Sequence, residues 1–155
     1  MLILYTERLF GNLSVLLDRL RATLKEKQYS LTQPRQAVFL ALQEQQPLSI
    51  HELVQRCATV DRASVYRSVA LFEQLGILQR LQMGWKYKLE LSDAFTAHHH
   101  HLVCLRCGKI LDIEDEKHID IFIRDAARRF GFTVLKHRFE VEGYCATCSA
   151  STRAV

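Results

Sequence analysis

Two pairs of cysteines have a spacing that suits metal binding in this sequence of 155 residues. Each pair has the pattern Cys-x2-Cys, and a glycine lies beside each, Gly108 after the first pair and Gly143 before the second. Four thiolates from two such turns match the tetrahedral geometry of Zn²⁺ and leave no position for a substrate. A redox pair is the alternative, but it needs one pair at a helix N-terminus and has no use for the second. We therefore predict a structural zinc site made by Cys104, Cys107, Cys145 and Cys148.

Four consecutive histidines run into the first cysteine pair. If this segment is extended, alternate side chains face opposite sides of the strand. His99 and His101 then share one face (the first site), and His98 and His100 share the other (the second site). One strand can thus supply two ligands to each of two metal sites. A solvated histidine-rich patch is the alternative.

Each histidine pair needs further ligands from elsewhere in the chain. The candidates for the first site are Glu90 and Asp112, which lie on predicted strands. The candidates for the second site are Asp120 and His137. Acidic residues on strands usually meet only water, which is the alternative at these positions. Imidazole with carboxylate suits Zn, Fe, Mn, Ni or Co, so the ligand types narrow the metal only loosely.

The segment Arg62–Arg67 has the composition of a DNA-recognition helix. The helical period turns Val65 toward the interior. The side chains that then face outward or to the flank are Ser64, Tyr66 and Arg67. Arginine suits phosphate or guanine, tyrosine suits a thymine methyl or a phosphate, and a small residue allows close approach. A solvated helix face is the alternative.

Four helices are predicted before the histidines. Leucines follow the period of an amphipathic helix from Leu13 to Leu24. A second helix begins at Thr32–Arg35, with a threonine cap and a proline in its first turn, and ends before Pro47.

Capping signals mark the third and fourth helices. Ser49 and Glu52 form a predicted capping box, and the helix that they begin ends near Cys57, a buried small hydrophobe by its position. Asp61 caps the fourth helix and Gly76 ends it.

A hairpin is predicted over Ile77–Leu91, with its turn at Met83–Gly84. After the turn, apolar and polar residues alternate strictly, so one face of the second strand carries Trp85, Tyr87, Leu89 and Leu91. Three helices followed by a hairpin indicate a winged helix-turn-helix.

The second half predicts a compact α/β unit. Short strands are expected near 102–105 and 110–113, a helix over Ile119–Phe130, and a strand over Phe132–Val141. We place one domain at 1–91 and another at 97–155, with a hinge at about 92–96.

Composition indicates an ordinary soluble protein. Hydrophobic residues make up 48% and charged residues 25%, and we find neither a membrane span nor a signal peptide, so we expect a cytoplasmic protein. The net charge of +4 is compatible with a polyanionic partner but does not require one.

Together these pieces resemble the ferric uptake regulator family of bacterial metalloregulators, from about Leu13 to Ser149. The matching segments are Thr32–Arg35, Ala63–Val69, Leu75–Ile77, His98–Lys109 and Gly143–Cys148. The resemblance implies an α+β protein: an N-terminal winged helix-turn-helix that reads double-stranded operator DNA, followed by a small α/β dimerisation domain with zinc knuckles. It also implies a homodimer.

The resemblance assigns a role to each candidate residue. Tyr66 and Arg67 would contact the operator, with Ser64 on the same helix and Arg35 near the DNA backbone. The cysteine quartet would hold structural zinc. The regulatory site would be Glu90, His99, His101 and Asp112. The second site within the dimerisation domain would be His98, His100, Asp120 and His137.

Two positions depart from the family pattern. Members often take a further histidine from just before the third helix, and that position falls at about Pro47 here. His51 lies one turn into the next helix and is a candidate substitute. Without this ligand a four-coordinate regulatory site would favour zinc. His100 stands where many members have aspartate.

We therefore expect a metal-responsive repressor of metal-homeostasis or peroxide-response genes, not an enzyme. Its regulatory ion would be Fe²⁺, Zn²⁺, Mn²⁺ or Ni²⁺, and metal binding would draw the wing strand toward the C-terminal domain. The alternatives are a zinc-ribbon adaptor that binds protein and a zinc hydrolase, although no His-Glu-x2-His motif is present.

Overall fold

The computed structural model describes residues 3–44, 47–113 and 116–150. Internal contacts divide the chain into two units. The first contains Met1–Leu81 and Tyr87–Thr96, and the second contains Gln82–Lys86 and Ala97–Val155. Helices followed by a small sheet unit confirm the predicted α+β class. None of the described helices has the length and hydropathy needed to cross a bilayer.

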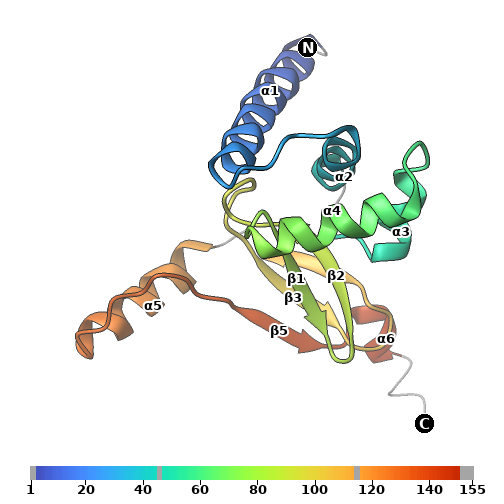
Figure 1. Cartoon of the computed structure of the whole chain (residues 1–155). Coiled ribbons are helices and arrows are strands. Elements are labelled where there is room, and N and C mark those ends of the chain that lie inside the picture. The colour runs from blue at the N-terminus through green and yellow to red at the C-terminus, as the bar shows by residue number, and fades with distance from the viewer. Residues whose placement is uncertain (1–2, 45–46, 114–115, 151–155) are drawn as a thin grey trace. The chain divides into compact units, whose positions relative to one another are not determined.

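Four helices build most of the first unit (Figure 1). Their bounds are α1 Ile3–Glu26, α2 Gln33–Glu44, α3 Ile50–Arg56 and α4 Arg62–Gln74. The predicted capping box is present: the Ser49 hydroxyl accepts from the Glu52 backbone N–H at 3.2 Å, and the Glu52 carboxylate accepts from the Ser49 N–H at 2.7 Å. These bonds satisfy two of the helix donors that have no partner inside the helix.

Local signals also fix both ends of α4. The Asp61 carboxylate accepts from the Ser64 backbone N–H at 2.9 Å. At the other end Gly76 has φ 67°, a left-handed conformation that glycine adopts at little cost. The Ile77 N–H then donates to the Phe72 carbonyl at 2.9 Å, which closes the helix as a Schellman motif.

One apolar core holds these helices against the hairpin. Each element contributes side chains at its own period, so the buried residues come from all four helices and from both strands. The largest fully buried side chains of this unit are Phe39, Phe72, Leu20, Leu24, Leu42, Leu48, Leu53, Ile77, Leu81, Leu89 and Leu91. Each contributes roughly 1.5–3 kcal/mol by leaving water.

The hairpin consists of β1, Leu78–Met83, and β2, Lys86–Leu91. Leu48 pairs with Leu89 of β2 through two backbone hydrogen bonds of 2.9 and 2.7 Å. The turn lies at Gly84–Trp85, one residue later than predicted, because Met83 still belongs to β1. Trp85 is therefore a turn residue and is 93% exposed, so its predicted place in the second strand, on one face with Tyr87 and Leu89, is wrong.

Residues 92–96 belong to the first unit and pack on its core. The Ser92 N–H donates to the Ile77 carbonyl at 3.0 Å, and the Ser92 hydroxyl donates to the Gly76 carbonyl at 2.7 Å. Phe95 is 3% exposed and meets Phe39 edge to face, with 5.4 Å between ring centroids. The segment is thus anchored on the helical core, and a hinge within it stays a prediction.

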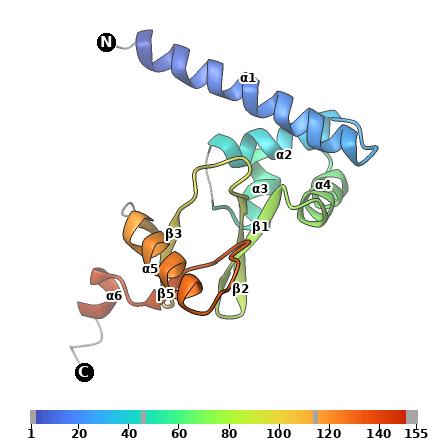
Figure 2. The ribbon, with the colours of Figure 1, turned by 90° about the vertical axis from the view of Figure 1, so that its left-hand side faces the viewer.

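The described part of the second unit contains a three-stranded sheet and two helices (Figure 2). The strands are β3 His100–Cys104, β4 Ile110–Ile113 and β5 Glu140–Gly143, in the order β4-β3-β5. β3 pairs antiparallel with β4 and parallel with β5. The helices are α5 Glu116–Arg129 and α6 Ala146–Ala150.

The strand predicted over Phe132–Val141 is wrong for most of its length. Only β5 is a strand, and residues 132–139 have no regular structure. A strand needs a hydrogen-bonded neighbour, and β3 has only five residues to offer. Large apolar side chains of this segment are exposed, with Phe132 at 70% and Leu135 at 94%.

The buried position of Phe95 yields a stability prediction. Phe95→Ala should lower the free energy of unfolding of the first unit by about 3–5 kcal/mol, because it removes a buried ring and leaves a cavity. Chemical denaturation followed by circular dichroism measures this. Trp85→Ala is the matched control and should change the free energy of unfolding by less than about 0.5 kcal/mol. Equal effects of the two changes would contradict the packing described here.

Candidate metal centres and nucleic-acid interface

Parallel pairing of β3 with β5 brings the two cysteine pairs together. Cys104 is the last residue of β3, and its register partner is Gly143, the last residue of β5. Parallel strands end at the same edge of a sheet, so the chain turns at the same place after each strand. Cys107 lies in the turn after β3, and Cys145 and Cys148 follow β5, the latter on α6.

The geometry of the quartet fits zinc. The four sulfur atoms lie within 4.8 Å of one another, and the sulfurs of Cys107 and Cys145 are 3.8 Å apart. Four Zn–S bonds of about 2.3 Å in a tetrahedron require S···S separations of about 3.8 Å. All four thiols are free. The residues that the sequence predicted as one site therefore lie in one place, already at ligand spacing.

Backbone N–H groups aimed at sulfur favour thiolates in this quartet. The Cys145 N–H donates to Sγ of Cys104 at 3.3 Å, and this contact is the main cause that lowers the pKa of Cys104 to about 6. A backbone hydrogen bond from Cys148 lowers the pKa of Cys145. Burial, followed by the neighbouring thiols, raises the pKa of Cys148 to about 12. The lowered pKa of Cys104 favours its thiolate, and a bound cation would favour the thiolate of Cys148 as well.

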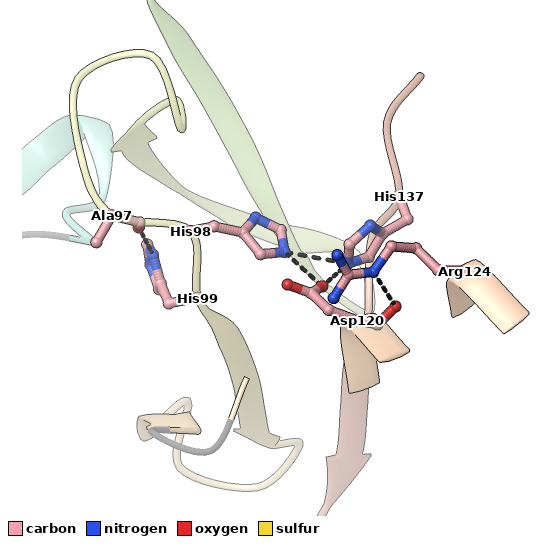
Figure 3. A network of polar contacts seen from close by, with 6 residues as sticks. All are labelled: Ala97, His98, His99, Asp120, Arg124 and His137. Carbon is pink, nitrogen blue, oxygen red and sulfur yellow. Dashed lines mark hydrogen bonds and ion pairs between the residues drawn. The ribbon is translucent and has the colours of Figure 1, made fainter. Parts of the chain in front are cut away.

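The second site joins three segments of the second unit (Figure 3). Nε2 of His98 lies 3.0 Å from Nε2 of His137, which lies 3.3 Å from Oδ1 of Asp120 on α5. His100 is 1% exposed, and its ring meets that of His98 edge to face. Ligand atoms at bonds of about 2.1 Å in a tetrahedron are about 3.4 Å apart. Three imidazoles and one carboxylate thus fit a divalent cation.

The first-site residues of the second unit lie on the opposite face of β3. The rings of His99 and His101 have centroids 4.6 Å apart. Nε2 of the buried His101 is 3.6 Å from Oδ1 of Asp112, its register partner on β4. Nδ1 of His99 lies 2.8 Å from the Ala97 carbonyl, which favours the tautomer with a proton on Nδ1 and leaves Nε2 for a metal.

Glu90 and His51 belong to the first unit. Glu90 is buried on β2, and its Oε1 accepts from the Gln79 amide at 2.9 Å. The alternation of the sequence placed Glu90 on the polar face, whereas Leu89, Glu90 and Leu91 are all buried. His51 shares a hydrogen bond of 3.0 Å with Gln55 on the exposed side of α3. Its role as a substitute ligand stays a prediction.

The predicted DNA-contacting residues of α4 form a fixed polar group. Tyr66 is 41% exposed and the Arg67 side chain is 71% exposed. The Arg67 guanidinium donates to the Ser64 hydroxyl at 2.6 Å, so Ser64 holds Arg67 in place on the helix surface. Val65 and Ser68 face the core. One side of α4 therefore presents a cation and a phenol on a rigid support.

Among the arginine–tyrosine contacts that escaped the sequence analysis, two involve predicted DNA-contacting residues of this unit. Arg62 stacks on the Tyr66 ring at 5.5 Å and donates to its hydroxyl at 3.3 Å, a pair that the i, i+4 spacing could have indicated. Arg35 stacks on the Tyr29 ring at 5.4 Å and donates to the Ser30 carbonyl. That second contact depends on the fold of the turn after α1, for which the sequence gives no signal.

Comparison with known proteins gives a consistent result. The sequence matches the model of the ferric uptake regulator family over residues 26–142. The ferric uptake regulation protein of Vibrio anguillarum is 34% identical over 131 residues, which are 79% of this chain and 85% of that protein. The solved ferric uptake regulator of Vibrio cholerae is 29% identical, with a TM-score of 0.66 over 81% of this chain and 98% of that chain.

A further solved structure, a zinc-bound manganese uptake regulator, is 26% identical, with a TM-score of 0.58 over 80% of this chain and 96% of that chain. The family match spans more than half of the chain, and the predicted resemblance is confirmed. The chain belongs to the ferric uptake regulator family and is a metal-responsive transcriptional regulator.

Proposed function

We propose that this chain acts as a zinc-containing homodimer that represses transcription in the cytoplasm by binding operator DNA when a regulatory metal is present. The observation that carries the proposal is that β3 contributes candidate ligands to all three metal sites. β3, together with His98 and His99 just before it, places imidazoles on both of its faces and a cysteine at the sheet edge. Such a strand can separate a permanent metal from an exchangeable one.

The cysteine quartet is proposed to hold the permanent metal, Zn²⁺. Four sulfur ligands leave no open position, which suits a structural role rather than catalysis. The quartet joins the turn after β3 to α6, so loss of zinc would release the C-terminal end of the unit. Cys57 takes no part, because it is buried at the end of α3 in the first unit.

The exchangeable metal is proposed to bind at the first site. His99, His101 and Asp112 would supply ligands from the second unit, and Glu90 is proposed as the ligand from the first. A metal can favour one arrangement of the units only by binding that arrangement more tightly. The ion would be Fe²⁺, Zn²⁺, Mn²⁺ or Ni²⁺. Relatives named for ferric and for manganese uptake support this range.

The second site is proposed to hold a further divalent cation. This cation would join three segments: β3 and the residues just before it through His98 and His100, α5 through Asp120, and residues 132–139 through His137. Large apolar side chains are exposed on α5 and just after it, with Phe122 at 72% and Phe130 at 86%. An apolar surface of this kind usually marks a protein interface, and we propose that a second copy of the chain covers it.

Domains at 1–91 and 97–155 are proposed, with the first reading DNA. In a two-fold dimer the paired recognition helices would enter major grooves about one helical turn apart. Tyr66 and Arg67 are proposed to contact the operator, with Arg35 near the backbone and Ser64 as the residue that positions Arg67.

Zinc affinity should depend on pH in a defined way. Zinc displaces the protons of those thiols that are not yet ionised, so affinity falls as pH falls. Because the pKa of Cys104 is lowered to about 6, its side chain is a thiolate above that pH. Below that pH it is a thiol, which must lose a proton when zinc binds. The slope of log affinity against pH should thus steepen by about one proton below pH about 6. Competition with a chromophoric chelator measures this. Cys57→Ala should keep the parent behaviour, and retention of zinc by Cys107→Ser would contradict the assignment.

DNA binding should depend on Arg67 and on salt. Arg67→Ala should weaken binding to an operator, selected from random DNA by the metal-loaded protein, by about tenfold or more. If Arg67 contacts a phosphate, its loss should also lower the salt dependence of binding. Fluorescence anisotropy over a salt series measures both. Arg21→Ala removes the same charge from exposed α1 and is the control. Salt-independent binding would favour the protein-binding adaptor instead.

Metal dependence should reside in the first site. His99→Ala and Glu90→Ala should each leave operator affinity nearly unchanged by added metal or chelator, because the ligand that couples metal to DNA binding is lost. The same anisotropy assay, run under anaerobic conditions with each candidate ion, measures this. His118→Ala, at an exposed histidine of α5, should respond to metal as the parent does. A normal metal response of both site variants would overturn the regulatory assignment.

A further inference from the structure

Glu140 is a carboxylate that the sequence did not connect with any site. It is the first residue of β5, and its register partner on β3 is His101. On the other side of β3, His101 is the register partner of Asp112. Residues that are partners across a sheet point to the same face. The row Asp112–His101–Glu140 therefore crosses the sheet on one face, with an imidazole between two carboxylates.

The spacing of this row suits shared binding of one cation. Neighbouring strands are about 4.8 Å apart, so each carboxylate begins one strand away from the imidazole. Asp112 already brings Oδ1 to 3.6 Å from Nε2 of His101. Glutamate has one more methylene than aspartate, so rotation of its side chain can bring Glu140 to a metal bound on the same nitrogen.

The burial of His101 and the charges of the two carboxylates also favour a bound cation at this row. His101 is 4% exposed and Glu140 is only partly exposed, so a carboxylate here loses some of its hydration. Among the residues that the structure describes, no cationic side chain forms an ion pair with Glu140. A divalent cation beside His101 would balance the charges of both carboxylates.

We propose that Glu140 is a ligand of the metal at the first site. The set His99, His101, Asp112 and Glu140 then comes entirely from the second unit. This inference rests on the proposed regulatory site. Glu140 would supply a ligand in place of the histidine that is absent near Pro47. It also changes the expected ion, since with Glu90 the site would offer five ligands. Such a site favours ions that accept more than four ligands over four-coordinate zinc.

The test uses the full chain with zinc in the cysteine quartet and with His98 and His137 replaced by alanine, which removes the second site. Co²⁺ is titrated into this parent and its visible absorption is recorded. Glu140→Gln should weaken Co²⁺ binding by about tenfold or more. Its d–d bands should also grow in intensity, because a lower coordination number gives stronger bands. Glu142→Gln is the control, since Glu142 is two residues along the same strand, opposite Val103.

The outcomes separate this inference from the proposed function. Glu142→Gln should match the parent in affinity and spectrum. Equal affinities and spectra for the parent and Glu140→Gln would overturn the role of Glu140, and so would equal weakening by both substitutions. His101→Ala should abolish the Co²⁺ signal. If it does not, the first site itself is misassigned, which is a failure of the proposed function. Circular dichroism melting of each variant shows that the fold is kept.

Discussion

The parallel pairing of β3 with β5 is the constraint on which the metal chemistry of this protein depends. It sets the ends of two strands side by side, so two cysteine turns that are distant in sequence meet at one edge. A shift of one residue in this register would turn the side chains of β5 to the other face of the sheet. Zinc bound just beyond the Cys104–Gly143 pair would hold the register fixed. The structural metal would thereby also keep Glu140 beside His101.

Different ligand types occupy different parts of β3. Four thiolates at its end would form a closed site for a soft or borderline ion, while imidazoles and carboxylates along its faces would suit an exchangeable divalent ion. Alternation of side chains keeps the two histidine pairs on separate faces, so two mixed sites can exist within one short strand. Hydrogen bonds from neighbouring groups prepare both kinds of site. Examples are the Cys145 N–H on Sγ of Cys104 and the Ala97 carbonyl on His99.

Much of this could be predicted because it depends on local spacing. The caps at Ser49 and Asp61, the end of α4 at Gly76 and the two cysteine turns are short-range patterns, and each has the predicted geometry. The grouping of His98 and His100 with Asp120 and His137 followed from strand alternation combined with the family resemblance. In each case a neighbour within a few residues, or a fixed period, limits the conformations available.

Tertiary structure alone decided the features that depend on which segments pair. The sequence could not show that Glu90 is buried, that Trp85 lies in a turn, or that residues 132–139 form no strand. It also could not show that Glu140 lies beside His101, or that Arg35 stacks on Tyr29. Periodicity reports which side of a strand a residue occupies, but the pairing partner and the register come from contacts between distant segments. By itself, the sequence determined the ligand types and the local elements; the pairing of β3 decided which ligands meet.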